Sequence, residues 1–294
     1  MKDKIILKSK AKYILYEGDC LNLIKNIPDN SIDLVVTSPP YCMGKEYDKS
    51  CEVDYFINLH EKIFPDVVRV LKPGGSLCWQ IGYYVNNGDV IPLDYLIYDL
   101  LKEQKELFLK NRIIWHYGHG FHSSKRFSGR HEVVLWFTKG KDSYKFNLDN
   151  VRVPQKYPGK TYYKGKRKGE FSGNPLGKNP ADIWEIPNVN ANHMEKTEHP
   201  CQFPVALIQR LVLALTNKGD IVLDPFMGSG SAGIATIVEG RRFIGFDNDK
   251  KYYKIAKKRC EESVAGKIKF RAYDKPIMEP NQKMAVARKP ASFK

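Results

Sequence analysis

The sequence predicts an α/β protein whose sheet is mostly parallel and carries helices on both faces. Three observations predict this class. Short apolar runs alternate with amphipathic stretches over residues 13–81, the same alternation returns over residues 204–262, and a glycine-rich turn joins a strand to a helix at residues 221–231. Parallel strands need crossover connections of this kind. With 294 residues, 42% of them apolar, the chain can bury a large core.

The first half of the chain follows the pattern most clearly. Hydrophobic period predicts strand, helix, strand, helix and strand in turn, over Tyr13–Tyr16, Asp19–Asn26, Ile32–Thr37, Tyr55–Leu71 and Ser76–Ile81. The L-K-P-G-G run at residues 71–75 is expected to stop the second helix and to turn the chain into the third strand. Two further strands are predicted, at Arg112–His116 and His131–Thr138.

The pattern changes over residues 139–197, where apolar periodicity is weak and Gly, Pro, Lys, Tyr and Asn dominate. This composition predicts an insert. Helix, strand, helix, strand and helix then follow, with bounds at Pro204–Thr216, Ile221–Leu223, a second helix through Val238, Phe243–Phe246 and Tyr252–Glu262. We therefore expect four parts: residues 1–138, the insert 139–197, residues 198–262, and a basic, loosely ordered tail at 263–294.

The net charge indicates the kind of partner. There are 48 Lys and Arg residues against 33 Asp and Glu, which gives +15 at pH 7. A bias of this size and sign favours a polyanion, with nucleic acid as the first candidate. A basic, well-solvated surface is the alternative.

The cysteines and the apolar runs exclude several classes. No C-x-x-C pair and no His partner at metal-ligand spacing occurs, so neither a zinc site nor a disulfide framework is expected. The six cysteines are scattered, at Cys20, Cys42, Cys51, Cys78, Cys201 and Cys260. No signal-peptide core and no apolar run of about 18 residues is found, so we expect a cytoplasmic protein with no membrane partner.

The glycine-rich turn has the sequence I-V-L-D-P-F-M-G-S-G-S at residues 221–231. Gly228 and Gly230 let the backbone approach a ligand closely. The next strand ends at Asp247, about twenty residues further on, where nucleotide-binding α/β folds use a carboxylate to accept from both ribose hydroxyls. An adenosine ligand is indicated, although the spacing suits a dinucleotide equally, and a purely structural tight turn is the alternative.

A second motif, T-S-P-P-Y at residues 37–41, directly follows the strand D-L-V-V. It therefore lies at the carboxyl end of a strand, where open α/β sheets bind ligands. Two consecutive prolines hold the backbone rigid. The Ser38 hydroxyl and the Pro39 carbonyl can then form a fixed pair of acceptors, and Tyr41 can supply a face for stacking. In isolation, the tetrapeptide could equally be an ordinary turn.

With both motifs in view, the chain closely resembles the DNA amino-methyltransferases that modify N4 of cytosine or N6 of adenine. The S-P-P-Y element comes first, D-P-F-M-G-S-G comes last, and a basic segment lies between them, which is the circularly permuted order of the family's beta class. The resemblance covers residues 13–262. It implies a Rossmann-like methyltransferase fold with S-adenosylmethionine (AdoMet) as cofactor, a catalytic half in 1–138 and an AdoMet-binding half in 198–262.

The resemblance also implies which residues form the site. The E-G-D-C run at 17–20 resembles the family's N-terminal acidic motif, which would put Asp19 near the cofactor's adenine amine. The H-P-C-Q-F-P run at 199–204 resembles the H-P-T-Q-K-P element that wraps the methionine end of AdoMet, with Cys and Phe in place of Thr and Lys. The implied cofactor residues are Asp19, His199, Cys201, Gln202, Asp224, Phe226, Gly228, Gly230 and Asp247. The implied catalytic residues are Ser38, Pro39, Pro40 and Tyr41, with no metal.

The implied chemistry explains why two acceptors are needed. An aromatic amine is a poor nucleophile because its lone pair is delocalised into the ring. Two acceptors that hold its N–H groups turn the nitrogen towards tetrahedral geometry and aim the lone pair at the methyl group, so that transfer needs mainly positioning. The target base must be flipped out of the duplex and held by stacking.

The insert at 139–197 occupies the family's target-recognition place. Tyrosines at 157, 162 and 163 interleave there with basic residues that could contact phosphates, namely Lys156, Lys160, Lys164, Lys166, Arg167 and Lys168. A solvated basic loop is the alternative. Arg126 and Arg130 belong to a second basic, glycine-containing stretch that could close over DNA. The strand from His131 to Phe137 resembles a sheet element that borders the base pocket, although core packing is the favoured interpretation of Trp136 and Phe137.

Cytosine N4 is the predicted target, because the family pattern associates Ser at the first motif position with cytosine and Asp or Asn with adenine. N6 of adenine is the alternative, since either amine could donate to Ser38. A non-catalytic DNA-binding protein with a degenerate fold, and a methyltransferase acting on RNA or a protein amide, are alternatives of another class. The expected partners are double-stranded DNA and a cognate restriction endonuclease, with the chain working as a monomer or homodimer in a prokaryotic cytoplasm.

Overall fold

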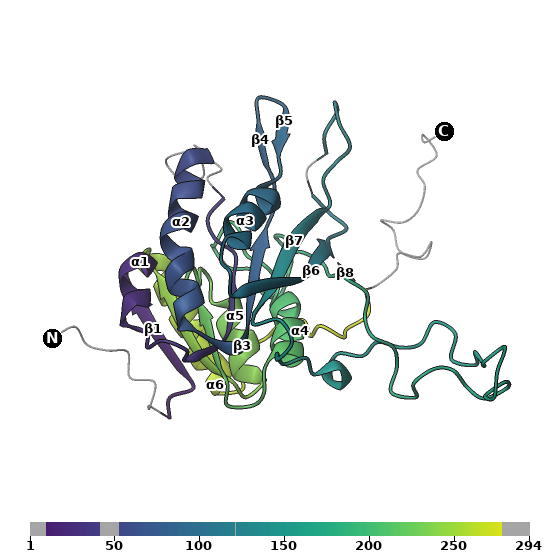
Figure 1. Ribbon diagram of the computed structural model, residues 1–294. Coiled ribbons are helices and arrows are strands. Elements are labelled where there is room, and N and C mark those ends of the chain that lie inside the picture. The colour runs from purple at the N-terminus through teal and green to yellow at the C-terminus, as the bar shows by residue number, and fades with distance from the viewer. Residues whose placement is uncertain (1–9, 42–52, 121, 278–294) are drawn as a thin grey trace.

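The computed structural model describes residues 10–41, 53–120 and 122–277. An eight-stranded sheet runs in the order β1-β10-β9-β2-β3-β7-β6-β8 (Figure 1). Its strands are β1 (Tyr13–Glu17), β2 (Ile32–Thr37), β3 (Leu71–Ile81), β6 (Leu107–His116), β7 (His131–Lys139), β8 (Ile183–Glu185), β9 (Ile221–Asp224) and β10 (Arg242–Asp247). Only β7 runs antiparallel to its neighbours, β3 and β6. The predicted mostly parallel sheet is confirmed.

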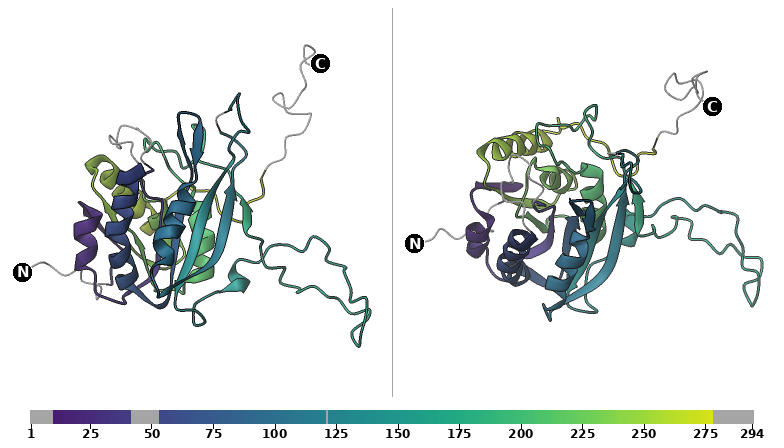
Figure 2. Two further views of the ribbon diagram at one scale, coloured as in Figure 1. Left: turned by 45° about the horizontal axis from the view of Figure 1, so that its top comes forward. Right: turned by 90° about the horizontal axis from the view of Figure 1, so that it is seen from above.

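Helices cover both faces of this sheet, as Figure 2 shows most clearly when the molecule is seen from above. One layer contains α1 (Cys20–Leu23), the 3-10 turn η1 (Ile24–Asn26), α2 (Val53–Val70) and α3 (Leu93–Lys102). The opposite layer contains α4 (Val205–Leu215), α5 (Ser231–Val238) and α6 (Lys250–Val264), with the 3-10 turn η2 (Leu148–Asn150) beside α4. The predicted α/β class, with helices on both faces, is therefore also confirmed.

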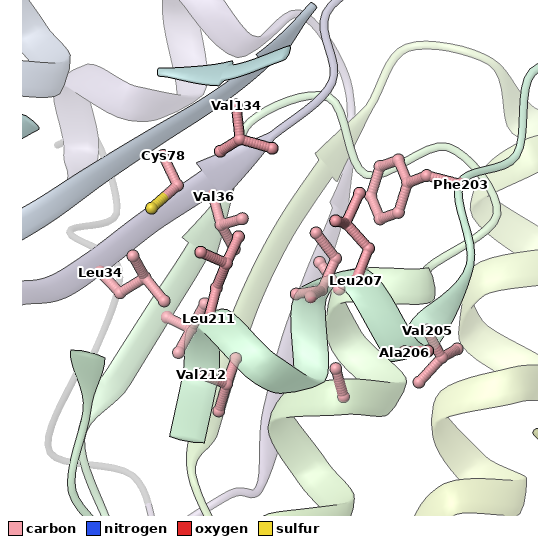
Figure 3. Close-up of a cluster of buried hydrophobic side chains, with 14 of the residues drawn as sticks. Leu34, Val36, Cys78, Val134, Phe203, Val205, Ala206, Leu207, Leu211 and Val212 are labelled. Atoms are coloured by element: carbon pink, nitrogen blue, oxygen red, sulfur yellow. The ribbon is translucent and has the colours of Figure 1, made fainter. Parts of the chain in front are cut away.

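Successive side chains of the central strands point to opposite faces of the sheet, so each strand contributes to two hydrophobic cores, one under each helical layer. In β2, Val35 packs with the α2 layer, whereas Leu34 and Val36 pack with the α4 layer. Figure 3 shows Leu207 and Leu211 of α4 beneath Leu34 and Val36. Because both faces are buried, the strand is apolar at every position except Asp33 and Thr37, which is why the sequence shows a continuous run rather than strict alternation.

Two aromatic residues of β7 follow the same alternation. Trp136 belongs to the α4 core and is 6% exposed, whereas Phe137 belongs to the α2 core and is 1% exposed. The preferred interpretation of both as core residues is confirmed.

The expected turn at residues 71–75 is present inside a strand rather than before it. Leu71 pairs with Ile32, and Ser76 pairs with Leu34, so that four residues of β3 lie opposite Asp33 alone. The extra residues bulge out of the ladder, with Gly74 at φ +76°. Four further elements were not predicted: α3, β8, η2, and a hairpin of β4 (Tyr84–Asn86) with β5 (Asp89–Ile91).

The ends of the predicted insert belong to the core. Val151, Trp184 and Ile186 are buried with the α4 layer, and β8 extends the main sheet. Between them, residues 153–178 form an arm that projects from the body (Figures 1 and 2). The predicted tail is likewise divided: α6 continues to Val264, and Phe270 and Tyr273 pack against the α4 core. Residues 278–294 lie outside the described ranges.

The cysteines in the described ranges are free thiols, and the helices there are not membrane-spanning segments. Cys20, Cys78, Cys201 and Cys260 are free thiols, while Cys42 and Cys51 fall outside these ranges. None of the helices that the structure describes is long and apolar enough to cross a membrane.

Candidate active site

Four neighbouring parallel strands end at the same edge of the sheet. Glu17 of β1 pairs with Asp247 of β10, and Gly245 of β10 pairs with Asp224 of β9. On the other side of β9, β2 ends at Thr37, directly before Ser38. The acidic motif, the glycine-rich turn and the S-P-P-Y motif, far apart in the chain, are therefore side by side at the carboxyl edge.

The glycine-rich turn needs both of its glycines. Gly228 and Gly230 have φ values of +48° and +78°, in the left-handed region that L side chains rarely adopt. A Cβ on Gly228 would lie 2.9 Å from Nε2 of His199, and a Cβ on Gly230 would lie 3.0 Å from Ala256 of α6. A side chain at Gly230 would therefore press on the backbone of α6, and one at Gly228 would push the His199 ring aside, in addition to the strain of the left-handed backbone at both positions.

Asp247 is held by the turn that it faces. Its Oδ2 accepts from the Gly228 N–H at 2.9 Å, and its Oδ1 accepts from the Asp249 N–H at 2.9 Å. Burial raises the pKa of Asp247 to about 6. Each carboxylate oxygen keeps a second lone pair, which is the acceptor set that a pair of ribose hydroxyls requires.

Asp224, the last residue of β9, is fully buried. Its Oδ1 accepts from the Thr37 hydroxyl at 2.5 Å and from the Phe226 N–H at 3.1 Å. Its Oδ2 has no hydrogen-bond partner among the described residues. Burial, with the nearby charge of Asp247 as a lesser cause, raises the pKa of Asp224 to about 7.

Asp19 is exposed and begins α1, where its carboxylate accepts from the Leu21 N–H at 2.9 Å and from the Asn22 amide at 3.2 Å. The preceding residue, Gly18, donates its N–H to the Asp247 carbonyl at 2.8 Å. The acidic motif is thus joined to the end of β10, as a shared nucleotide pocket requires.

The residues of the H-P-C-Q-F-P loop, at 199–204, differ in how close they lie to the glycine-rich turn and in how far they are buried. The His199 ring packs on Tyr252 with ring centres 4.4 Å apart and also borders Gly228. Gln202 is buried, and its amide is engaged by Thr197 and by the Glu195 carbonyl at 2.8 Å. Cys201 is exposed.

Phe203 explains why the loop tolerates a change from the family's Lys. Its side chain is buried and packs beside Leu207 against the sheet (Figure 3). At this position the chain therefore has an apolar anchor for α4. Pro204 is the residue just before α4, not its first helical residue, and Glu195 accepts from the Val205 N–H at 2.9 Å in place of a local cap.

The S-P-P-Y motif adjoins a polar network that the sequence did not reveal. Ser38 Oγ lies 3.2 Å from the Tyr41 hydroxyl, which in turn lies 3.0 Å from Gln80 Oε1 and 3.4 Å from Glu132 Oε2. The Gln80 amide donates to Glu132. Gln80 comes from β3, and Glu132 comes from the start of the antiparallel strand β7, which begins at this same edge. Pro39 is buried, and Pro40 and Tyr41 are half-buried.

Tyr41 is also constrained by its neighbours. A Cβ on Gly82 would lie 3.2 Å from the Tyr41 ring and 3.4 Å from Glu132. Burial and the Glu132 carboxylate raise the pKa of Tyr41 well above its usual value. The phenol therefore keeps its proton at neutral pH.

The predicted DNA-contacting residues of the arm lie away from this site (Figures 1 and 2). All six basic residues of the arm are exposed: Lys156, Lys160, Lys164, Lys166, Arg167 and Lys168. The two halves of the arm are joined by backbone hydrogen bonds, including one from the Tyr162 N–H to the Glu170 carbonyl at 2.9 Å. Arg167 stacks over Tyr162 at 4.5 Å and pairs with Glu170 at 2.8 Å, so one of the six cations is already partly neutralised.

The second basic stretch joins β6 to β7, directly before Glu132. Arg126 is exposed and lies over the Tyr83 ring at 5.6 Å, and Arg130 is half-buried. The Tyr117 N–H donates to the Arg130 carbonyl at 2.9 Å. This stretch, unlike the arm, is therefore attached to the rim of the pocket.

The residues of this site fit AdoMet by their donor and acceptor set. Asp247 can accept from ribose, and Gly228 leaves room that a Cβ would fill. Within the described residues, no group of three or more His, Cys, Asp or Glu side chains could hold a metal ion.

Comparison with solved structures agrees with this geometry. PvuII DNA methyltransferase, which is cytosine-N4-specific, superposes with a TM-score of 0.67 at 23% identity, covering 85% of this chain and 86% of that one. TTHA0409 from Thermus thermophilus, described as a DNA modification methylase and solved with S-adenosyl-L-methionine, superposes with a TM-score of 0.62 at 26% identity, covering 87% and 97%. Fold and pocket together make this protein an AdoMet-dependent methyltransferase with a Rossmann-like fold.

Sequence comparison defines the family. The model of the N6/N4 DNA methylase family matches residues 32–258, and the chain belongs to this family. The type II methyltransferase M.BglII of Bacillus subtilis is 48% identical over 243 residues, which are 82% of this chain and 67% of that protein. The DNA adenine methyltransferase YhdJ of Escherichia coli (strain K12) is 34% identical over 258 residues, which are 86% and 84% of the two chains.

Proposed function

We propose that this protein transfers a methyl group from AdoMet to N4 of a flipped-out cytosine in double-stranded DNA. The observation that carries the proposal is the position of Ser38 and Tyr41 beside the pocket of Asp224 and Asp247, at one edge of the sheet. A base amine bound at the first pair would adjoin a methyl donor bound at the second. The proposed function needs no other chemistry from the chain.

We assign the cofactor to the residues around the glycine-rich turn. Asp247 would accept from the ribose hydroxyls, and the exposed Asp19 would accept from the adenine amine. Phe226, next to the buried Trp79 with ring centres 6.1 Å apart, would supply an apolar wall. When bound, AdoMet supplies an electrophilic methyl group on a sulfonium. His199, Cys201, Asp224, Gln202, Gly228 and Gly230 would shape the rest of the pocket, with Gln202 acting through the loop that it stabilises.

The acceptors of the S-P-P-Y motif would prepare the amine. Ser38 Oγ and the Pro39 carbonyl would each accept one N–H of the amine, and Pro40 keeps the chain rigid between them and Tyr41. Holding both hydrogens turns the lone pair away from the ring and towards the methyl group. The Tyr41 ring would stack on the flipped base. The amine nitrogen would take the methyl group directly as its bond to the sulfonium breaks, so that no covalent intermediate with the chain is needed, and the methylated nitrogen would then release one proton.

Two basic segments would hold the duplex. The arm carries the exposed cations Lys156 to Lys168 and interleaved tyrosines, a combination suited to phosphate contacts. Arg126 and Arg130 lie on the stretch beside the base pocket and would contact DNA close to the flipped base. On this view the insert at 139–197 is the target-recognition part, inserted between a catalytic half and an AdoMet-binding half.

The choice of base rests on Ser38. Ser at this motif position favours cytosine, whereas Asp or Asn favours adenine in the family pattern. N6 of adenine is the second candidate, favoured by the similarity to the DNA adenine methyltransferase YhdJ. The similarity to type II methyltransferases such as M.BglII supports a role in a restriction-modification system beside a cognate endonuclease.

One experiment decides the base. Duplex DNA is incubated with the protein and with AdoMet labelled in the methyl group, digested to nucleosides and analysed by mass spectrometry. N4-methylcytosine is the expected product, and N6-methyladenine alone would replace the proposal with the second candidate. Binding of a duplex without methyl transfer would support a DNA-binding protein instead, and faster methylation of RNA than of duplex DNA would redirect the substrate assignment.

A further inference from the structure

In the polar network next to the S-P-P-Y motif, each hydroxyl can either donate or accept. Which of Ser38 and Tyr41 donates to the other decides how many lone pairs the Ser38 hydroxyl has free for a substrate. A hydroxyl has one hydrogen to donate and two lone pairs to accept with. The contact between Ser38 Oγ and Tyr41 Oη, 3.2 Å long, allows either oxygen to be the donor. If Tyr41 donated, a lone pair of Ser38 would be occupied.

Glu132 settles the orientation of Gln80. An ionised carboxylate only accepts, so the Gln80 group that faces Glu132 Oε2 must be the amide NH2. The reverse orientation would bring two acceptor oxygens together in a half-buried site. The Gln80 carbonyl oxygen is therefore turned towards Tyr41, 3.0 Å from its hydroxyl.

The hydroxyl hydrogen of Tyr41 is then donated to Gln80 or Glu132 and not to Ser38. Both of its other neighbours, Gln80 Oε1 at 3.0 Å and Glu132 Oε2 at 3.4 Å, are acceptors. The raised pKa of Tyr41 means that the hydrogen is present at neutral pH. Once it is donated to either oxygen, the Ser38 hydroxyl can only donate to Tyr41 Oη, and both lone pairs of Ser38 remain for another group.

We infer that Glu132 and Gln80 are positioning residues that orient the Ser38 hydroxyl, through Tyr41, as an acceptor for the amino group to be methylated. This inference rests on the proposed function and adds two residues to it. Neither of the two needs to touch the base or the cofactor. The relay also gives the Tyr41 hydroxyl a task separate from the stacking of its ring.

The test uses isosteric variants of the full chain: Glu132→Gln, Tyr41→Phe and the double variant. Gln at 132 can present its own NH2 to Gln80, which removes the constraint on the Gln80 amide. Single-turnover methyl transfer at saturating DNA and AdoMet should fall about 10- to 100-fold for Glu132→Gln, the range found when outer partners that orient a ligating side chain are removed. AdoMet affinity and melting temperature should be unchanged. Glu61→Gln, at an exposed position on α2, is the matched control.

The double variant distinguishes a relay from two separate effects. Because Glu132 acts through the Tyr41 hydroxyl, adding Glu132→Gln to Tyr41→Phe should cause little further loss, a strong coupling in a double-mutant cycle. Multiplicative losses would overturn the inference, as would a wild-type rate in Glu132→Gln.

A swap gives an independent check. In Gln80→Glu with Glu132→Gln, the carboxylate at 80 accepts from Tyr41 directly, and much of the rate lost in Glu132→Gln should return. A folded swap variant that stays as slow as Glu132→Gln would overturn the relay. A wild-type protein that transfers no methyl group would instead refute the proposed function, so the two failures are distinguishable.

Discussion

The Thr37 hydroxyl donates to Asp224 Oδ1 over 2.5 Å, which ties the last residue of β2 to the last residue of β9. One strand end continues into the S-P-P-Y motif, and the other continues into the glycine-rich turn. Beyond the last pair of the β2–β9 ladder, Val35 with Leu223, this buried hydrogen bond links the proposed base site to the proposed cofactor site.

Replacing Thr37 by Val tests this connection. The change keeps the shape of a fully buried side chain but removes the donor, and we expect it to lower the free energy of unfolding by about 1–3 kcal/mol. Since Asp224 lines the proposed pocket, AdoMet affinity should fall as well. Thermal denaturation and calorimetric titration measure the two effects. Unchanged stability together with unchanged affinity would show that the two sites are linked elsewhere.

Ser38→Ala and Tyr41→Ala should affect different steps. Loss of one amine acceptor in Ser38→Ala should raise the barrier by roughly 2–4 kcal/mol, by analogy with the loss of one preorganised hydrogen-bond partner. AdoMet affinity should be largely kept. Tyr41→Ala should weaken capture of the flipped base and thus the apparent affinity for duplex DNA. Steady-state rates that match wild type in both variants would refute the assignment of the motif.

The sequence was sufficient for those parts of the site that are contiguous in the chain. Ser38 to Tyr41 and the turn before Gly230 are local motifs that follow strands, so period and composition locate them. Gln80 and Glu132 are different, because they meet only through the antiparallel pairing of β3 with β7, which no local pattern specifies. A polar residue inside the apolar run of residues 77–81 was the one available signal.

The elements that the sequence did not predict were missed for the same physical reason. β4, β5 and β8 have three residues each, too few to show a period of two. The antiparallel direction of β7 depends on the chain reversal between β6 and β7, which hydrophobic pattern does not encode. Trp184 is buried in the core beside α4, with Arg210 5.0 Å from its ring centre, although it lies in a segment whose composition resembles a loop.

The carboxyl groups of the pocket predict a pH effect on cofactor binding. The pKa of Asp247 is raised from 3.8 to about 6, so the ionised form that accepts from ribose hydroxyls is populated only as the pH rises through 6. AdoMet affinity should therefore increase between pH 5 and pH 8. Asp247→Asn should bind more weakly and lose most of this dependence, whereas Asp89→Asn, exposed on β5, should behave as wild type. Calorimetric titration with AdoMet across this pH range measures the affinity. A wild-type affinity that does not change with pH would contradict the prediction.

Asp224 predicts the accompanying change in stability. Its pKa is about 7 in the folded chain against 3.8 for an ordinary Asp, so the folded state favours the protonated form. That stabilising contribution is fully present below pH 3.8 and is lost as the pH rises through 7. Asp224→Asn should therefore gain stability relative to wild type as the pH rises from 4 to 8, with an upper bound of about 4 kcal/mol. Chemical denaturation at several pH values measures it, and parallel curves would contradict it.

The arm predicts a salt-dependent loss of DNA affinity. Changing Lys156, Lys160, Lys164, Lys166 and Lys168 to Gln should leave the melting temperature and AdoMet affinity unchanged. The slope of log K for duplex DNA against log salt concentration should become shallower by up to about 4.5, since each of the five phosphate contacts contributes about 0.9. The same change at five exposed lysines of α6, Lys250, Lys251, Lys254, Lys257 and Lys258, is the control for total charge. Equal losses in both sets would mean that the arm has no special part in binding.

The root of the arm is closed by one pair of reciprocal backbone hydrogen bonds, between Val153 and Lys178, 3.0 Å and 2.9 Å long. The sheet and its carboxyl edge lie on the other side of these two hydrogen bonds from the arm. Their structure does not depend on the identity of the residues between 153 and 178. The segment can therefore lengthen, shorten or be exchanged for another between these two positions at little cost to folding. Under the proposed function, exchange of this segment would change the recognition sequence and leave the residues proposed for methyl transfer unaltered.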